Sequence, residues 1–287
     1  YSCAGTKTCQ ERPGSRGFEF QDARTYASWD VDYLKYDWCN VTTQDAKASY
    51  SIMRDAIYEA GRPMVFSICE WGQNKPWEWG KEVGHLWRTT GDIRDTWESM
   101  ISIIDKERDL AKFAGPGGWN DPDMLEVGNG GMTTEEYKTH FSMWCMMHSP
   151  LLLGNDLTNM SNETIEIITN EEIISLNQSP FVYQARRLID YGNLEVWGKP
   201  LISTISGEVA VALLNRSQNT ETITFGLESV GLNASEGYRI KDLWTKETYP
   251  LSKQEEITRT IVGHGVVVLI IKGESLPFNV FQYKDNE

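Results

Sequence analysis

Five short apolar runs in the N-terminal part of the chain end in side chains that can act as acids, bases or nucleophiles. These runs are VDYLKYD, MVFSICEW, VGHLWRTTGD, GGWNDPDML and PLLLGND. Because the carboxyl ends of parallel strands meet at one face of a barrel, we expect these side chains to lie close together. Asp37 follows Lys35 at one strand end, and Asp92 follows Arg88 at another. Two carboxyl groups in different surroundings acquire different pKa values, which suits a nucleophile and a proton donor in glycoside hydrolysis.

Several of these residues also have simpler explanations. A single Asp most often caps a helix, belongs to a turn or faces solvent, so the prediction rests on the whole set. Trp71 follows Glu70 at a strand end, where a flat aromatic face can line a sugar pocket. Trp197 and Trp244 are better explained as core residues. Cys69 is most simply a small buried hydrophobe.

Other catalytic patterns are missing from the sequence. It contains no GxSxG, GxGxxG, GxxxxGK[ST] or HExxH pattern, so the corresponding hydrolase, nucleotide and zinc sites are not expected. The four histidines are scattered, which argues against a histidine-centred metal site. A histidine-centred metal or triad site is therefore not expected.

The elements that must position these residues alternate between strand and helix patterns up to about residue 178. Apolar residues at helical spacing follow Thr43, and a strand pattern (PMVFSICEW) comes next. Thr133 and Glu136 have the spacing of a capping box, which predicts a helix through about His148. Beyond the NQSP segment the pattern changes to short runs rich in β-branched residues. This predicts a second domain made of β-strands.

The composition excludes some classes of partner. The 287 residues carry a formal net charge of −14, and no basic cluster is available to neutralise phosphates, so neither nucleic acid nor an anionic membrane is an expected partner. The longest apolar run, residues 266–271, is far shorter than the roughly 18 residues of a membrane span. The five cysteines allow at most two disulfides.

Taken together, the motifs resemble the family 27 glycoside hydrolases of clan D, which contain α-galactosidases and α-N-acetylgalactosaminidases. The resemblance covers most of the chain, and it rests on YSCAGTKTC, RPGSRG, DYLKYDWC, CEW, LWRTTGD, GPGGWNDPDML, SPLLLGNDL and NQSP, in that order. It implies an α/β fold: a (β/α)8 TIM-barrel catalytic domain over residues 1–182, followed by an antiparallel β-sandwich domain over residues 183–287. Five strand ends are found where eight are expected, and the sequence starts at Tyr1 without a leader, so we expect the N-terminal barrel strands to be missing and the chain to be part of a longer protein.

The resemblance also assigns roles to residues. Asp37 is implied as the nucleophile and Asp92 as the general acid/base, with Asp92 expected to be partly buried so that it stays protonated before attack. The residues implied to contact or line the sugar pocket are Tyr1, Lys35, Cys69, Glu70, Trp71, Arg88, Asp123 and Met124. A disulfide between Cys9 and Cys39 is implied, although Cys3 is close enough in sequence to compete for Cys39. Cys69 is then a free thiol. The implied mechanism requires no metal or organic cofactor.

The expected substrate follows from the residues around CEW. Glu70 and Trp71 look like the galactosidase version of this segment, which implies terminal α-D-galactose on oligosaccharides, galactomannans or glycoconjugates. Three alternatives remain: an α-N-acetylgalactosaminidase, a β-L-arabinopyranosidase, and an inactive sugar-binding fragment. The disulfide implies an oxidising compartment, so the protein is expected to be secreted, periplasmic or lysosomal. A homo-oligomer is compatible with the resemblance.

Overall fold

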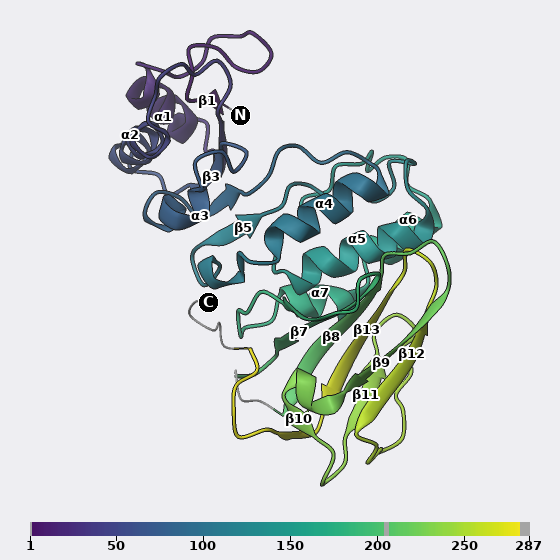
Figure 1. Cartoon of the computed structure of the whole chain (residues 1–287). Helices are drawn as coiled ribbons and strands as arrows, with labels where there is room; N and C mark the ends of the chain where they lie inside the picture. The colour runs from purple at the N-terminus through teal and green to yellow at the C-terminus, as the bar shows by residue number, and fades with distance from the viewer. Residues whose placement is uncertain (1, 204–206, 282–287) are drawn as a thin grey trace. The chain divides into compact units, whose positions relative to one another are not determined.

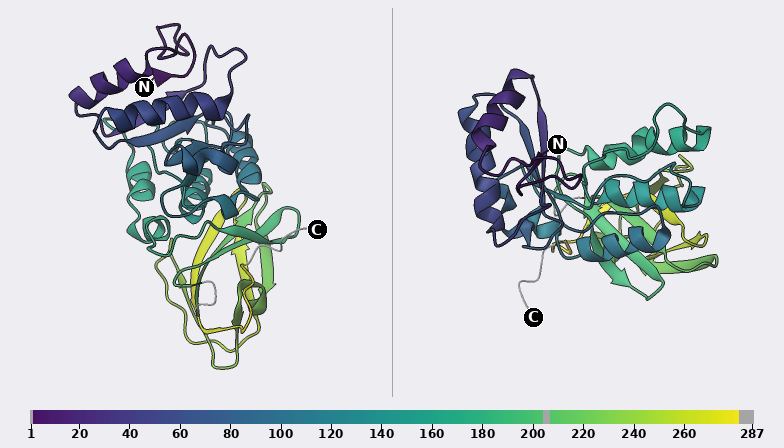
Figure 2. Two further views of the ribbon diagram at one scale, coloured as in Figure 1. Left: turned by 90° about the vertical axis from the view of Figure 1, so that its left-hand side faces the viewer. Right: turned by 90° about the horizontal axis from the view of Figure 1, so that it is seen from above.

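The computed structural model describes residues 2–203 and 207–281 (Figures 1 and 2). Tyr1, which the sequence places in the sugar pocket, lies outside the described residues. The chain forms two compact units. The first unit contains residues 1–92 and 113–123, and the second contains residues 93–112 and 124–287. In the described parts of the chain, no helix is both long and apolar enough to cross a membrane.

The first unit is built on a parallel sheet with strand order β1-β2-β3-β4-β5. The strands are β1 (Ser2–Cys3), β2 (Tyr33–Asp37), β3 (Val65–Cys69), β4 (Leu86–Arg88) and β5 (Trp119–Asp121). The helices are α1 (Glu19–Ser28), α2 (Ala46–Glu59) and α3 (Pro76–Trp79), with a 3-10 turn η1 (Gly80–Glu82). A second 3-10 turn, η2 (Ala111–Phe113), contains a boundary between the two units. Helices α1 and α2 lie side by side against this sheet (Figure 2). Strands joined in this way through helices bring all their carboxyl ends to one edge.

The two faces of this sheet have opposite character because successive side chains alternate along a strand. Tyr36, Ile68 and Trp87 share one core with Tyr50 and Met53 of α2. The predicted helix is confirmed, since its buried residues repeat at helical spacing and the Asp45 side chain caps its first turn by accepting from the Ala48 N–H. The opposite face of the sheet carries the polar side chains that form the candidate site.

One predicted strand is not part of this sheet. The segment PLLLGND contributes only an isolated parallel bridge between Leu153 and Leu125, both in the second unit. The sheet still has five strands because β1 belongs to it, with Cys3 of β1 paired to Asp37 of β2. Leu125 donates its N–H to the Leu152 carbonyl oxygen and accepts from the Gly154 N–H, which makes the bridge. Pro150, earlier in the segment, offers no N–H to a strand partner.

In its described residues, the second unit packs four helices on antiparallel sheets. The helices are α4 (Trp97–Glu107), α5 (Thr134–Met146), α6 (Asn162–Ile168) and α7 (Glu171–Asn177), with a 3-10 turn η3 (Leu227–Val230) further on. The main sheet has the order β11-β13-β8-β7-β6, and two-stranded sheets pair β12 with β9 and β10 with β14. The strands are β6 (Arg186–Asp190), β7 (Leu194–Pro200), β8 (Glu208–Asn215), β9 (Glu221–Gly226), β10 (Leu232–Asn233), β11 (Arg239–Asp242), β12 (Glu256–Ile261), β13 (Val266–Lys272) and β14 (Glu274–Ser275).

Strand β8 has a continuous run of apolar residues, without the alternation of apolar and polar residues that a half-exposed strand shows. Ala210 and Ala212 lie in a core shared with Trp144 of α5, whereas Val209 and Val211 lie in a second core with residues of β9 and β12. A strand buried on both faces reads as a continuous apolar run. The second unit therefore has one hydrophobic layer between helices and sheet and another between the two sheets.

The start of α5 agrees with the sequence, but its end comes earlier. Thr133 and Glu136 form the predicted capping box through both reciprocal hydrogen bonds. The helix ends at Met146 rather than near His148, because His148 has a left-handed backbone with φ of +54° and Pro150 follows. The α/β fold class is confirmed: parallel β/α units precede antiparallel sheets that pack face to face.

Candidate active site

The candidate site lies at the carboxyl ends of β2 to β5 in the first unit. Asp37 on β2 is in register with Cys69 on β3, and Arg88 on β4 is in register with Asp121 on β5. The Arg88 Nη1 atom lies 3.9 Å from the Cys69 Sγ atom, which joins the two pairs across β3 and β4. Three charged groups and a thiol from four neighbouring strands therefore meet at one edge of the sheet, as the sequence predicts.

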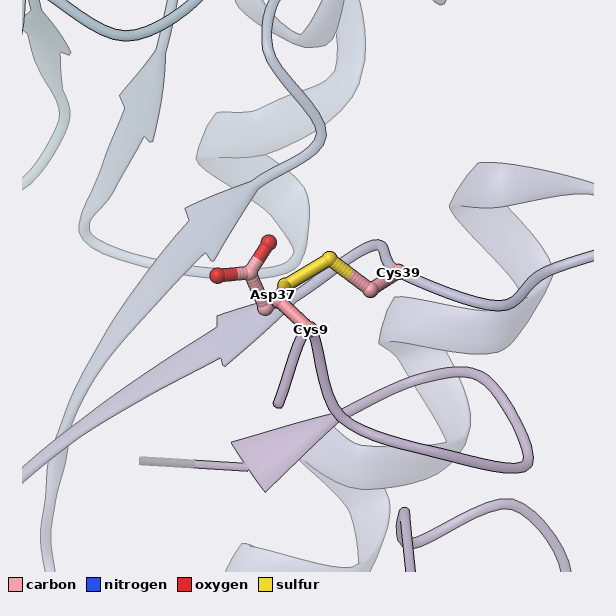
Figure 3. A group of neighbouring side chains, drawn as sticks. All are labelled: Cys9, Asp37 and Cys39. Carbon is pink, nitrogen blue, oxygen red and sulfur yellow. A yellow bond between two sulfur atoms is a disulfide. The ribbon is translucent and has the colours of Figure 1, made fainter. Parts of the chain in front are cut away.

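Asp37 is held against the disulfide between Cys9 and Cys39 (Figure 3). Its side chain is almost completely buried, and Oδ1 accepts a hydrogen bond of 2.8 Å from the Trp38 N–H. One carboxylate oxygen and both sulfur atoms lie within 4.8 Å of one another. Sulfur atoms in a disulfide are not thiolates, so this group does not form a metal-ligand set.

The pairing of the cysteines follows the resemblance. Cys9 and Cys39 are bridged with their Cα atoms 5.1 Å apart, whereas Cys3 and Cys69 are free and buried. The Cys3 thiol instead donates to the Cys39 carbonyl oxygen at 2.9 Å. Burial raises the pKa of Cys69 to about 12, although Lys35 and Arg88 act in the opposite direction, so this thiol stays protonated. The bridge therefore links the loop after β1 to Cys39, two residues after Asp37.

Arg88 is the centre of the charged network. Its Nη2 atom lies 2.8 Å from Asp123 Oδ2 and 3.1 Å from Asp92 Oδ1, and it also donates to the Thr90 carbonyl oxygen at 3.2 Å. Burial on its own would lower the pKa of Arg88, but the neighbouring Asp123, Cys69, Asp121 and Asp92 raise it. The guanidinium therefore stays charged and orients two acidic residues at once.

Asp121 and Asp123 form a tight turn after β5. Asp121 Oδ1 accepts a hydrogen bond of 2.9 Å from the Asp123 N–H. Burial raises the pKa of Asp121, and the nearby charges of Arg88 and Lys35 lower it in part. Asp123 has φ of +87°, a conformation that costs energy for a residue with a Cβ and that is concentrated at functional sites. From the sequence, Asp121 is recognised only as a strand-end acid, and its role in shaping this turn is missed, although its two-residue spacing from Asp123 could have indicated it.

Asp92 differs from its expectation. Its side chain is 79% exposed, so it is not partly buried in this structure. Asp92 follows Gly91 in the loop after β4, and a Cβ placed on Gly91 would meet nothing within 4 Å, so the neighbouring position is open as well. The ion pair with Arg88 is its contact with the charged network.

Glu70 and Trp71 lie in the turn that follows β3. Glu70 is fully buried, and its Oε2 atom accepts hydrogen bonds of 2.6 Å from both the backbone N–H and the side-chain amide of Asn74. Burial raises the pKa of Glu70, and the bonds from Asn74 oppose that shift. Trp71 has φ of +60° and packs partly against the core of the first unit. Glu70 thus holds the turn that presents Trp71.

Lys35 and Met124, which are also predicted to contact the sugar, belong to different units. Lys35 is half-buried on the polar face of β2, two residues before Asp37, and its charge influences both Cys69 and Asp121. Met124 belongs to the second unit and is partly exposed.

Comparison with known proteins covers both parts of the chain. Residues 1–179 match a family model described as alpha galactosidase A, and residues 191–271 match the alpha galactosidase C-terminal beta sandwich domain. Alpha-galactosidase A of Cellvibrio japonicus is 47% identical, over 94% of this chain and 70% of the relative. The chain spans 64% to 70% of the length of three of the curated relatives that it matches.

Solved structures give the same result. Alpha-galactosidase I from Mortierella vinacea superposes with a TM-score of 0.91 at 34% identity, over 96% of this chain and 76% of that one. An α-galactosidase from Saccharomyces cerevisiae, solved with raffinose, superposes with a TM-score of 0.84 at 28% identity, over 95% of this chain and 79% of that one. These matches agree in family over nearly the whole sequence. The chain therefore belongs to the α-galactosidase family, glycoside hydrolase family 27.

Proposed function

We propose that this protein is a retaining α-galactosidase that removes terminal α-D-galactosyl residues. The observation that carries the proposal is the pair of carboxylates at one edge of the sheet, Asp37 at the end of β2 and Asp92 in the loop after β4, with the buried guanidinium of Arg88 paired to Asp92. Their surroundings differ, because Asp37 is buried and Asp92 is exposed. The acid role of Asp92 is therefore proposed from its place in the LWRTTGD motif and its contact with Arg88, and not from burial.

The proposed mechanism is a double displacement. A carboxylate oxygen of Asp37 attacks the anomeric carbon while Asp92 donates its proton to the departing glycosidic oxygen, so the carbon–oxygen bond to the aglycone breaks as the bond to Asp37 forms. Asp92, now ionised, takes a proton from water, which attacks the same carbon and releases Asp37 and galactose. Two inversions retain the configuration. The two carboxyl groups need to be roughly 5 to 5.5 Å apart during the reaction.

The remaining residues would bind and orient the sugar. The N–H of Trp38 fixes one oxygen of Asp37, which limits the directions in which the nucleophile can point. Arg88 and Asp123 form a buried charged pair, and charged groups of this kind make strong hydrogen bonds to sugar hydroxyls, with the Lys35 charge close by. Trp71, held by the Glu70 turn, offers an aromatic face to the sugar ring. The mechanism uses only these side chains and water.

The substrate class and the setting are part of the proposal. The Saccharomyces cerevisiae relative solved with raffinose supports galactose-terminated oligosaccharides, and galactomannans or glycoconjugates share the same terminal group. The Cys9–Cys39 disulfide supports an oxidising compartment, whether secreted, periplasmic or lysosomal. The proposed division into a catalytic module (residues 1–182) and a β-sandwich module (residues 183–287) follows the change of pattern in the sequence.

A hydrolysis assay tests the proposal. The 287-residue chain and an N-terminally extended version are incubated with p-nitrophenyl α-D-galactopyranoside, the α-N-acetylgalactosaminide and the β-L-arabinopyranoside. We expect release from the α-galactoside and its loss in Asp37→Asn, which keeps the shape of the side chain but removes the nucleophile. Activity that survives in Asp37→Asn would refute the role of Asp37. Galactose binding without release would point instead to a sugar-binding protein.

A further inference from the structure

Asp121 is a buried acid that the proposed mechanism does not use. It ends β5, in register with Arg88 of β4, and it is almost completely inaccessible to solvent. Its carboxylate oxygen Oδ1 accepts a hydrogen bond of 2.9 Å from the Asp123 N–H. Its carbonyl oxygen accepts from both the N–H and the hydroxyl of Thr89, at 3.1 and 3.2 Å. All four residues belong to the first unit, so Asp121 connects the turn after β5 to the loop after β4 within that unit.

The hydrogen bond to Asp121 holds Asp123 in an unfavourable backbone conformation. Asp123 has φ of +87°, in the left-handed region that is costly for a residue with a Cβ. The turn between β6 and β7 has the same arrangement, because Asp190 Oδ1 accepts from the Gly192 N–H at 2.8 Å and Gly192 has φ of +82°. Glycine adopts such a φ without steric cost. An aspartate in this conformation is explained if its side chain makes an interaction that glycine cannot make.

That interaction is the buried ion pair with Arg88. Asp123 Oδ2 lies 2.8 Å from Arg88 Nη2, and both side chains are buried. The direction of the guanidinium therefore depends on where the Asp123 backbone places this carboxylate. The other acid on Nη2 is Asp92, which is exposed, and an exposed ion pair does not fix a side chain strongly. The contacts thus lead from the Asp121 carboxylate through the Asp123 backbone to Arg88.

We propose that Asp121 is a positioning residue for galactose binding, because its carboxylate fixes the Asp123 backbone and so orients the Arg88–Asp123 pair. The inference rests on the proposed function, in which this pair binds sugar hydroxyls. Asp121 contributes a hydrogen-bond acceptor at a fixed place, and an amide oxygen at the same place can do the same. Without any acceptor, the Asp123 N–H loses this partner, the strained turn relaxes, and the pair no longer matches the hydroxyls of the sugar.

Two substitutions of similar shape test this role. Asp121→Asn keeps an oxygen that can accept from the Asp123 N–H, whereas Asp121→Leu has no acceptor. Galactose binding is measured by calorimetry, together with hydrolysis of p-nitrophenyl α-D-galactopyranoside, in both versions of the chain used for the hydrolysis assay. We expect the dissociation constant for galactose to rise by about tenfold or more in Asp121→Leu, and by less than about threefold in Asp121→Asn.

The matched control is Asp190→Leu, which removes the corresponding acceptor for the Gly192 N–H in the second unit. It should change neither galactose binding nor hydrolysis. Positioning is also distinguished from a loss of folded protein. A smaller folded fraction lowers the apparent kcat and the number of binding sites, but it leaves the dissociation constant of the remaining sites unchanged.

Each remaining outcome decides the question. An unchanged dissociation constant in Asp121→Leu, or equal rises in Asp121→Leu and Asp121→Asn, would overturn the proposal. If Asp121→Leu does not fold, Asp121→Ala replaces it under the same criteria, and if neither folds, the acceptor serves folding alone and the proposal fails. A wild-type protein that binds galactose but does not hydrolyse the galactoside would refute the proposed function while the binding comparison still tests Asp121. A wild-type protein that does neither would refute the proposed function, and this inference with it.

Discussion

Arg88 and Asp123 form a buried ion pair, with Nη2 and Oδ2 2.8 Å apart and side chains that are only 2% and 8% exposed. The same Nη2 atom also lies 3.1 Å from the exposed carboxylate of Asp92. One guanidinium thus connects a buried acid to an exposed one at the edge of the sheet. This arrangement gives Arg88 a structural role, and the proposed function adds a role in sugar binding.

Removing Arg88 should be costly for stability. Arg88→Met removes the cationic partner of the buried Asp123, and breaking a buried pair from one side typically costs about 3 to 5 kcal/mol. Urea unfolding measures the loss. The double variant Arg88→Met/Asp123→Leu removes both charges of the pair, so it should regain at least about 1 kcal/mol of the difference. A single variant as stable as the wild type would contradict the structural role of this pair.

The disulfide beside Asp37 should stabilise the fold. Cys9 and Cys39 are separated by 30 residues, and closing a loop of that length lowers the entropy of the unfolded chain by an amount equivalent to about 3 to 4 kcal/mol. The Cys9→Ser/Cys39→Ser variant should unfold at correspondingly lower urea concentration and should no longer respond to a reductant. If added reductant destabilises this variant as much as the wild type, the effect does not come from the bridge.

Stability should fall in acid because of two buried histidines. Burial lowers the pKa of His140 to about 3, and burial together with the Lys199 charge lowers that of His148 to about 3. Below an unfolded pKa near 6.5, the unfolded chain binds protons that the folded chain does not, so the free energy of unfolding falls as the pH drops from 6.5 towards 3. Each group contributes about 1.4 kcal/mol per pH unit.

Substitution of one histidine tests this pH dependence. His140→Gln keeps an acceptor for the Glu126 N–H, which bonds His140 Nε2 at 3.0 Å, but it cannot titrate. Its urea midpoint should therefore change less than that of the wild type between pH 7 and pH 5. The exposed His85, changed to Gln, is the control. An unchanged pH slope in His140→Gln would show that this residue is not responsible.

Gly61 and Gly72 have the same left-handed backbone conformation. Comparing alanine variants of the two therefore separates the cost of a strained backbone from the cost of a steric clash. Gly72, in the turn after β3, has φ of +75°, and a Cβ there would lie 2.0 Å from the Thr89 carbonyl oxygen. Gly61 has φ of +76° with nothing within 4 Å of a Cβ. Gly61→Ala should cost only the conformational term of about 1 to 2 kcal/mol, whereas Gly72→Ala should cost clearly more and reduce activity by moving the Trp71 turn. Equal losses of stability in the two variants would mean that the turn containing Gly72 can move away from the Thr89 carbonyl oxygen at little cost.

The local elements could be predicted because their signals are local. The helical spacing of Tyr50 and Met53 and the capping box of Thr133 and Glu136 are complete within a few residues, and the structure has both. The strand β1 could not be predicted, because its two residues pair only through contact with Tyr36 and Asp37 far along the chain. For the same reason, the segment PLLLGND has strand composition but forms only one bridge.

The sequence by itself determined the fold class, the family and the two candidate carboxylates, because strand and helix periodicities and contiguous motifs are properties of neighbouring residues. It also implied the partner of Cys39. Only the tertiary structure decided that Arg88 is shared between Asp92 and Asp123, that Asp92 is exposed, and that Tyr137 holds Asp95 across 42 residues of chain. The burial of a side chain and its hydrogen-bond partners depend on the residues that lie next to it in space, and many of these are far away in the sequence.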